Sequence, residues 1–202
     1  RTYQTGAAGV RFLEQLNGDD PFCLCLSFAD PHVPHLAPRR FEKLYPLDRL
    51  EMYPAREGEV QERARRFDIK YRAQKADTAD EEGRRHYMAV YYAMVTWVDE
   101  MIGRVMAKLR ELGLEENTIV VFTSDHGDFC FEHNMCKKDL VLVESLLHVP
   151  MLISWPGGIE PPSLRRLVSL CRKGLNLQAQ LIVIPAPEGE PVVLGFAVHR
   201  DV

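Results

Sequence analysis

An α/β fold, with helices flanking a mostly parallel central sheet, is the architecture that this sequence predicts. Two observations support it. A strongly periodic helix over about 82–112 is followed by the apolar run 118–124, and a helix-then-strand order is typical of a parallel sheet. Two further apolar runs of strand length, 21–28 and 149–155, would supply other strands of the same sheet.

Composition is that of an ordinary globular protein. The 202 residues suffice for one sizeable core, 46% of them are hydrophobic, 27% are charged, and the net charge is -4. Basic residues are offset by acids, and no apolar stretch is long enough to span a bilayer. We therefore expect neither a nucleic-acid partner nor a membrane span, and nothing in the composition indicates an oligomeric state.

The cysteines and the first residues bear on location. The five cysteines are odd in number and lie in or beside apolar segments, which favours buried thiols in a reducing compartment, and so a cytoplasmic location, over a disulfide framework. The chain begins Arg-Thr-Tyr-Gln, without Met and without a signal peptide, so we expect the original amino terminus to lie upstream.

The amino-terminal part is predicted to alternate helix, strand and loop. Apolar spacing over 5–17 indicates a helix that ends at Asn17-Gly18, and 21–28 indicates a short buried strand. Three prolines then exclude a helix over 29–38. The polar stretch 39–82 is interpreted as loops and a solvated charged segment.

The second half is predicted to begin with the long helix, whose last turn Gly113 follows. Its expected apolar face comprises Met88, Tyr91, Val95, Val98, Ile102, Val105, Leu109 and Leu112, with Asp99 solvated. The remaining predicted elements are strands over 118–124 and 149–155, a loop over 127–143, a helix over 164–170, and a hairpin of 181–184 with 192–198.

Asp125 and His126 are the most informative pair in the chain. They directly follow the strand 118–124, and Gly127 lets the backbone turn away beneath them. A carboxylate and an imidazole at the carboxyl end of a buried strand are well placed to bind a metal ion. Taken alone, the pair fits equally well as capping residues of the next segment.

Two loops rich in histidine follow two of the predicted strands. The first holds Asp30, His32 and His35; the second holds Asp125, His126, Asp128, Glu132, His133, Lys137 and Lys138. If the strands are parallel, the loops meet at one edge of the sheet. Such an edge could bind a metal ion and an anionic ester, with lysine and histidine facing the developing negative charge.

Three segments resemble the sulfatase family, a member of the alkaline-phosphatase-like superfamily that also contains the phosphonate monoester hydrolases. They are residues 21–35, 117–128 and 148–157, in the family's order. The resemblance covers residues 1–160 and implies an alkaline-phosphatase-like sandwich, incomplete at its amino terminus. We therefore predict a partial catalytic domain over 1–160 and a divergent segment of uncertain structure over 161–202.

The resemblance also implies residue roles. Asp125 and His126 match a pair of ligands to a divalent cation, commonly Ca²⁺, with Mg²⁺ and Mn²⁺ as alternatives. His32 matches the histidine that contacts the sulfate ester and assists its leaving group. Lys138 matches the lysine that holds a sulfate oxygen. Lys137 and Phe131 stand where the family often has glycine, which leaves Lys137 as the alternative to Lys138.

Other residues near these loops are given structural roles. His35 fits participation in the site and simple packing equally well, and Asp19-Asp20 is interpreted as a turn rather than a metal pair. Glu132 and His133 are expected to shape the loop, and Cys130 and Cys136 to pack.

The sequence departs from the family in one major respect. None of its cysteines lies in the Cys-x-Pro/Ala-Ser-Arg segment that sulfatases mature to formylglycine, and the family's first metal-binding Asp pair is also missing. We expect a metal-dependent hydrolase of small-molecule or glycan sulfate esters whose formylglycine lies in the full-length protein, and an isolated chain without activity. The alternatives are a phosphonate monoester or phosphodiester hydrolase of the same superfamily and a non-catalytic truncated relative.

Overall fold

The computed structural model describes residues 1–17, 21–54, 80–138, 142–156 and 180–185, together with Gly58 and Ile69. Contacts divide the chain into two compact units. The sheet unit comprises Arg1–Ala29, Val98–Asp125 and Pro150–Val202, and the loop unit comprises Asp30–Trp97 and His126–Val149. Each unit is described by itself.

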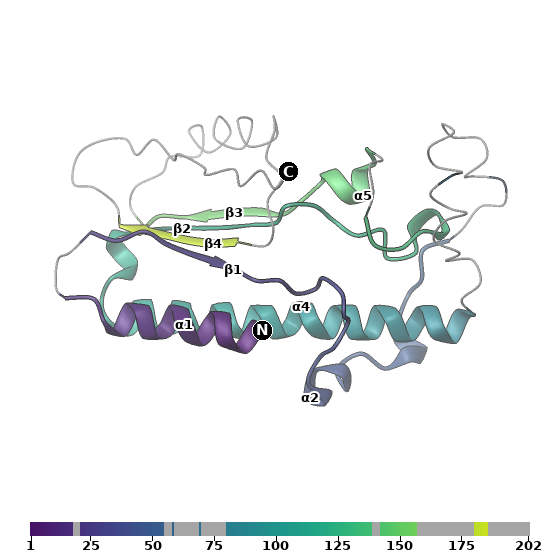
Figure 1. Ribbon diagram of the computed structural model, residues 1–202, viewed down its shortest axis with the longest axis horizontal. Helices are drawn as coiled ribbons and strands as arrows, with labels where there is room; N and C mark the ends of the chain where they lie inside the picture. The colour runs from purple at the N-terminus through teal and green to yellow at the C-terminus, as the bar shows by residue number, and fades with distance from the viewer. Residues whose placement is uncertain are drawn as a thin grey trace. The chain divides into compact units, whose positions relative to one another are not determined.

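The sheet unit contains a four-stranded sheet in the order β1-β4-β2-β3 (Figure 1). The strands are β1 (Leu24–Ser27), β2 (Thr118–Thr123), β3 (Met151–Ser154) and β4 (Gln180–Pro185). An α/β fold is therefore confirmed, as are the predicted strands over 21–28, 118–124 and 149–155.

A mostly parallel sheet is not what the described strands form, because all three pairings are antiparallel. Two of these pairings involve β4, which pairs with both β1 and β2 and was predicted to form a hairpin with 192–198 instead, and the third joins β2 to β3. Since both are antiparallel to β4, β1 and β2 run in the same direction. The predicted arm 192–198 and the predicted helix 164–170 lie outside the described residues.

Burial differs between the strands. β2 is buried almost throughout, and its Ile119 and Val121 pack with Met151, Ile153 and Trp155. β1 instead alternates, with Leu24 and Leu26 buried while the thiols of Cys23 and Cys25 are exposed. The prediction of a fully buried strand with buried cysteines is therefore wrong for this segment, because successive side chains point to opposite faces and only one face is covered.

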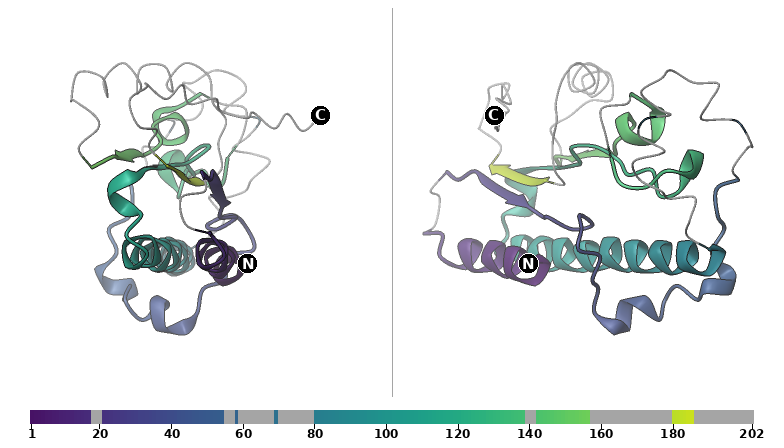
Figure 2. Two further views of the ribbon diagram at one scale, coloured as in Figure 1. Left: turned by 90° about the vertical axis from the view of Figure 1, so that its left-hand side faces the viewer. Right: turned by 45° about the vertical axis from the view of Figure 1, so that its right-hand side comes forward.

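Helix α1 (Thr2–Glu14) confirms the predicted amino-terminal helix and packs closely in the sheet unit. It runs beside the carboxyl-terminal part of α4 (Figures 1 and 2). Gly6 faces Met101 and Gly9 faces Leu26 and Val105, and the absence of a side chain at both glycines allows this approach. Lys108 of α4 adds an ion pair with Glu14 at 3.2 Å.

The residues that flank helix α4 (Glu81–Glu111) explain where it begins and ends. Asp80 Oδ1 accepts a hydrogen bond from the Gly83 amide at 2.7 Å, which satisfies one free N–H group of the first turn. Gly113, with φ of +69°, closes the last turn as predicted, and the amides of Gly113 and Leu114 return to carbonyls of Arg110 and Leu109.

The apolar face of α4 is only partly as predicted. Met88, Val98, Val105 and Leu109 are buried, but Val95 and Leu112 are 44% and 42% exposed. The helix passes through both units, and each unit buries its own set of residues, so one continuous stripe does not describe it. The buried residues that the prediction omitted are Ala89, Val90, Ala93, Met94 and Met101.

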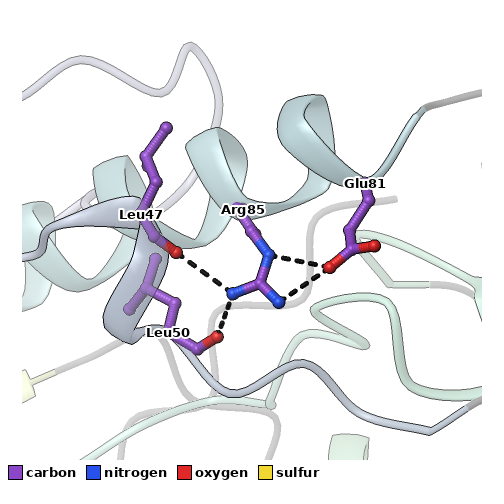
Figure 3. Close-up of polar contacts among 4 residues, drawn as sticks. All are labelled: Leu47, Leu50, Glu81 and Arg85. Carbon is purple, nitrogen blue, oxygen red and sulfur yellow. Dashed lines mark hydrogen bonds and ion pairs between the residues drawn. The ribbon is translucent and has the colours of Figure 1, made fainter.

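The described part of the predicted solvated segment, residues 39–54, is mostly exposed and mostly loop, as predicted, but it makes specific contacts with α4. It contains the short helix α2 (Arg39–Glu42) and the 3₁₀ turn η1 (Leu47–Arg49). The buried Phe41 stacks on Trp97, with ring centroids 6.4 Å apart. The guanidinium of Arg85 donates to the carbonyls of Leu47 and Leu50 while bonding Glu81 one turn away (Figure 3). Local pattern missed these long-range partners.

The remaining described elements are short. They are the 3₁₀ turns η3 (Glu115–Asn117) and η4 (Glu132–Asn134) and the helix α5 (Glu144–Leu147). Within the described ranges, no helix combines the length and apolar character needed to cross a bilayer.

Replacing Gly6 with alanine tests the close packing of α1. The new Cβ would lie 2.8 Å from Cβ of Met101, an atom that cannot rotate away. We expect the free energy of unfolding to fall by about 1–3 kcal/mol, since this clash outweighs the roughly 1 kcal/mol gained in helix propensity. Urea unfolding followed by circular dichroism measures the change.

Gly103→Ala is the matched control, because a Cβ there meets nothing within 4 Å. It should raise stability by roughly 0.5–1 kcal/mol through reduced backbone entropy of the unfolded chain. If Gly6→Ala proved as stabilising as Gly103→Ala, the close approach of α1 to Met101 would be wrong.

Candidate functional site

Two loops of the loop unit carry the predicted site residues. The histidine loop, residues 30–38, leaves the sheet after β1, and the lysine loop, residues 126–138, leaves it after β2. Both loops contact Tyr87 of α4: the ring centroid of His35 lies 4.5 Å from that of Tyr87, and the ring centroid of Phe131 in the lysine loop lies 5.0 Å from it. The structure therefore brings the two loops together.

His32 lies exposed on the histidine loop. Its Nδ1 is 2.9 Å from the carbonyl oxygen of Val33. A carbonyl can only accept, so Nδ1 carries the proton and Nε2 carries the lone pair. In its neutral form this ring presents Nε2 as an acceptor, and once protonated it becomes a donor at the same atom.

His126 and Lys138 form the tightest polar contact of the predicted site. The ammonium of Lys138 lies 2.6 Å from Nε2 of His126, and Nδ1 of the same ring lies 2.7 Å from the carbonyl oxygen of Gly127. Because the carbonyl fixes the proton on Nδ1, Nε2 accepts the hydrogen bond from Lys138. This contact joins the first and last residues of the lysine loop.

Asp125 is the last residue of its section of the sheet unit, and His126 begins the next section of the loop unit. The carboxylate and the Nε2 lone pair are suitable donors for a divalent cation. Two donors alone do not complete a site for a hard cation such as Ca²⁺, which takes six to eight oxygens. Among the described residues, no three His, Cys, Asp or Glu side chains gather to hold a metal.

Gly127 is required for close approach of the backbone rather than for a left-handed turn. Its amide donates to the carbonyl of Leu146 at 2.9 Å, and an added Cβ would collide with the carbonyl oxygen of Ser145. The lysine loop is thereby held against α5. From the sequence, this glycine was expected to let the backbone turn. In the structure it is needed instead for close approach of the backbone to Ser145.

The lysine loop contains five residues with positive φ that are not glycine: Cys130, Phe131, His133, Asn134 and Lys137. Phe131 and Lys137, at +70° and +62°, stand where the resemblance leads one to expect glycine. The left-handed backbone that glycine favours is therefore kept here by residues for which it costs energy.

Packing compensates for part of this cost. The ring of Phe131 is buried edge-on to Tyr87 at 5.0 Å, with the guanidinium of Arg84 5.4 Å from its centroid. Arg84 also donates to the side-chain oxygen of Asn134 at 2.8 Å. Two left-handed residues of the loop are thus attached to α4 by side chains that lie in the loop unit.

Sequence reasoning missed Asp128 as an organising residue. Its Oδ1 accepts hydrogen bonds from the amides of Cys130 and Lys137, both at 2.9 Å. Only its position in Asp-His-Gly-Asp drew attention to it. The tyrosines of α4 that line the same region, Tyr87 and Tyr91, were assigned to a helix face and not to the site.

Three buried side chains near Asp128, those of Cys130, Tyr87 and Tyr91, have raised pKa values. Burial raises the pKa of the Cys130 thiol well above its usual value, and the charge of Asp128 adds to this shift. Burial also raises the pKa of Tyr87 and Tyr91 far above the usual tyrosine value. The prediction that Cys130 packs rather than reacts agrees with this environment.

Comparison with known proteins decides the family. The sulfatase family model matches residues 7–176. The chain belongs to the sulfatase family. It is 34% identical over 187 residues to an ulvan-active sulfatase of Formosa agariphila, a match that covers 91% of this chain and 30% of the relative. It is also 28% identical over 172 residues to the iduronate 2-sulfatase of Homo sapiens, covering 76% of this chain and 30% of that enzyme.

The fold is shared with solved members of the superfamily. The phosphonate monoester hydrolase of Silicibacter pomeroyi superposes with a TM-score of 0.57 at 28% identity, over 63% of this chain and 27% of that protein. This sulfatase-family chain thus spans less than a third of the length of each of these three relatives.

Lys137→Gly should stabilise the lysine loop. Lys137 is exposed with φ of +62°, so glycine removes a backbone cost of about 1 kcal/mol, and we expect a gain of roughly 0.5–1 kcal/mol. Lys137→Val, whose branched side chain tolerates this conformation poorly, should instead lose about 1–2 kcal/mol. Urea titration of both variants measures the difference, and a loss in the glycine variant would contradict the left-handed assignment.

His35 should make stability fall as the pH falls. Burial lowers its pKa in the folded chain, and the nearby charge of Lys137 acts in the same direction against that of Asp128. Below the unfolded value of about 6.5, the unfolded chain therefore takes up the proton more readily. The contribution of His35 to the free energy of unfolding is complete above that pH and is lost progressively below it.

His35→Phe keeps an aromatic ring against Tyr87, whose centroid lies 4.5 Å from that of His35, but cannot titrate. We expect the difference in unfolding free energy between pH 7.5 and pH 5 to be smaller for this variant than for the wild type. Equal slopes for the two proteins would show that His35 is not buried as described.

Proposed function

We propose that the complete protein hydrolyses sulfate esters and that residues of the histidine and lysine loops act on the ester. The observation that carries this proposal is the contact of the Lys138 ammonium with His126 Nε2 at 2.6 Å, within a loop that meets the loop of His32. A cation and imidazoles gathered in this way suit the binding of a tetrahedral anion.

We propose that Asp125 and His126 bind a divalent cation, with Ca²⁺ as the first choice and Mg²⁺ or Mn²⁺ as alternatives. The bound cation would neutralise charge on the ester oxygens. Proton placement at His126 supports this role, since Nδ1 is committed to the Gly127 carbonyl and Nε2 keeps its lone pair. That single lone pair serves either a cation or Lys138, so the contact with Lys138 would belong to the protein without a bound cation.

Two residues of this chain, Lys138 and His32, would have separate roles in the reaction. Lys138 would bind a sulfate oxygen and stabilise its charge, and protonated His32 would donate from Nε2 to the departing alcohol. The attacking nucleophile, a formylglycine, would come from a segment outside these 202 residues, because no cysteine here has the required surroundings. The common direction of β1 and β2 supports a mostly parallel sheet in the complete domain.

The substrate class proposed is a small-molecule or glycan sulfate ester. The relative named for activity on ulvan supports a glycan. Likeness to a phosphonate monoester hydrolase favours the second candidate, hydrolysis of phosphonate monoesters or phosphodiesters, since both ester types are tetrahedral anions. A third candidate is a chain that is inactive by itself.

The decisive experiment compares the full-length protein with the 202-residue chain on an aryl sulfate and on a phenylphosphonate monoester. We expect turnover of the sulfate by the full-length protein, loss on chelation, recovery with Ca²⁺, and none by the isolated chain. His32→Ala and Lys138→Ala should each lower kcat/KM by about 10²–10³-fold.

Lys137→Ala is the matched control for Lys138→Ala, because both lysines are exposed and adjacent. Its activity should stay near that of the wild type; the reverse outcome would assign the role to Lys137. A preference for the phosphonate would establish the second candidate, and wild-type rates after both His32→Ala and Lys138→Ala would refute the site.

A further inference from the structure

Asp128 joins the two ends of the lysine loop through one oxygen atom. Its Oδ1 accepts from the amide of Cys130, near the start of the loop, and from the amide of Lys137, near its end, at 2.9 Å each. Between these contacts the amide of Phe129 donates to the carbonyl of Lys137, also at 2.9 Å. The ends of the segment 128–137 are therefore joined by two hydrogen bonds, one of which depends on this carboxylate, while the bond to Cys130 shapes the turn that follows Asp128.

The closed segment contains unfavourable backbone conformations, which favour its opening. It holds five left-handed residues that are not glycine, a conformation that is unfavourable for residues with a side chain. Hydrogen bonds to an ionised acceptor are stronger than those to a neutral one. The two bonds to Asp128 therefore offset part of the cost of this backbone.

The position of Lys138 follows from this closure. Lys138 is bonded to Lys137, whose amide Asp128 holds, and His126 lies two residues before Asp128. Fixing Lys137 beside Asp128 therefore brings the Lys138 ammonium within 2.6 Å of His126 Nε2. Without that restraint, the backbone of Lys138 would be freer to move relative to His126.

Asp128 also faces the opposite loop. Its charge acts on His35 of the histidine loop and on Tyr87 and Tyr91 of α4, so the carboxylate lies where these elements meet. His35 packs edge-on against Tyr87, with centroids 4.5 Å apart. The carboxylate thus borders the packing that seats the histidine loop.

We propose that Asp128 is a positioning residue for the sulfatase site: through Oδ1 it closes the lysine loop and holds Lys138 against His126. The use of Lys138 in catalysis rests on the proposed function, whereas its position does not. The prediction is therefore tested by a readout that needs no turnover.

The experiment measures lysine acylation by acetic anhydride and amide hydrogen exchange by mass spectrometry, in the full-length protein freed of divalent cations by chelation, the state in which Lys138 contacts His126. Asp128→Ala should raise the acylation rate of Lys138 by about 5–10-fold, toward that of the exposed Lys43, and speed exchange at Lys137 by at least about 10-fold. Asp128→Asn keeps an acceptor oxygen and should restore both values to within about 3-fold of the wild type.

Asp99→Ala, which removes an exposed aspartate of α4, is the matched control and should change neither rate. If Asp128→Ala does not fold, the Asn variant decides alone. Acylation of Lys138 as fast as that of Lys43 in Asp128→Asn would overturn the proposal, as would unchanged rates in a folded Asp128→Ala.

Activity separates this proposal from the proposed function. If the protein hydrolyses sulfate esters, Asp128→Ala should lower kcat by about 10-fold or more with a smaller change in KM, and Asn should rescue it. Absence of turnover in the wild type would refute the proposed function. The acylation and exchange results would still decide the role of Asp128.

Discussion

The left-handed backbone of the lysine loop is the constraint on which the candidate site depends. Five residues that are not glycine adopt this conformation within eight positions of the chain, from Cys130 to Lys137. Such a segment persists only where its surroundings determine it strongly. Here they do so at both ends through Asp128, and in the middle through Phe131 and Asn134, which are attached to α4.

The aromatic surface of α4 therefore has a functional consequence. Met88 is buried with Cys130 and Phe131, and tyrosines of the same helix surround this cluster. The same surface seats His35, so one helix contacts both loops that carry the proposed chemistry. Loops that depend on long-range packing in this way can be positioned accurately enough for catalysis although they lack regular structure.

Family membership and chemistry are separate conclusions. The sulfatase family is established by a match over residues 7–176, whereas the roles of Asp125, His126, His32 and Lys138 are proposals based on local geometry. That geometry favours anion binding in general, since an ammonium and imidazoles bind any tetrahedral anion. Discrimination between sulfur and phosphorus esters requires the nucleophile, which no described residue supplies.

The sequence by itself determined the elements whose signals are local. Periodicity and end residues located α1, α4 and the strands β1, β2 and β3, since caps and apolar spacing act within a few residues. The loops that follow β1 and β2 were also singled out as carriers of the candidate site residues, whose roles stay predictions.

Only the tertiary structure decided the rest, because the deciding contacts join distant residues. β4 enters between β1 and β2 and is antiparallel to both, and β3 is antiparallel to β2, which no local pattern encodes. Arg85 and Trp97 make contacts with residues 39–54 that the polarity of this mostly exposed segment did not indicate. Asp128 closes a loop against amides up to nine residues away, since a carboxylate's partners depend on how the chain folds around it.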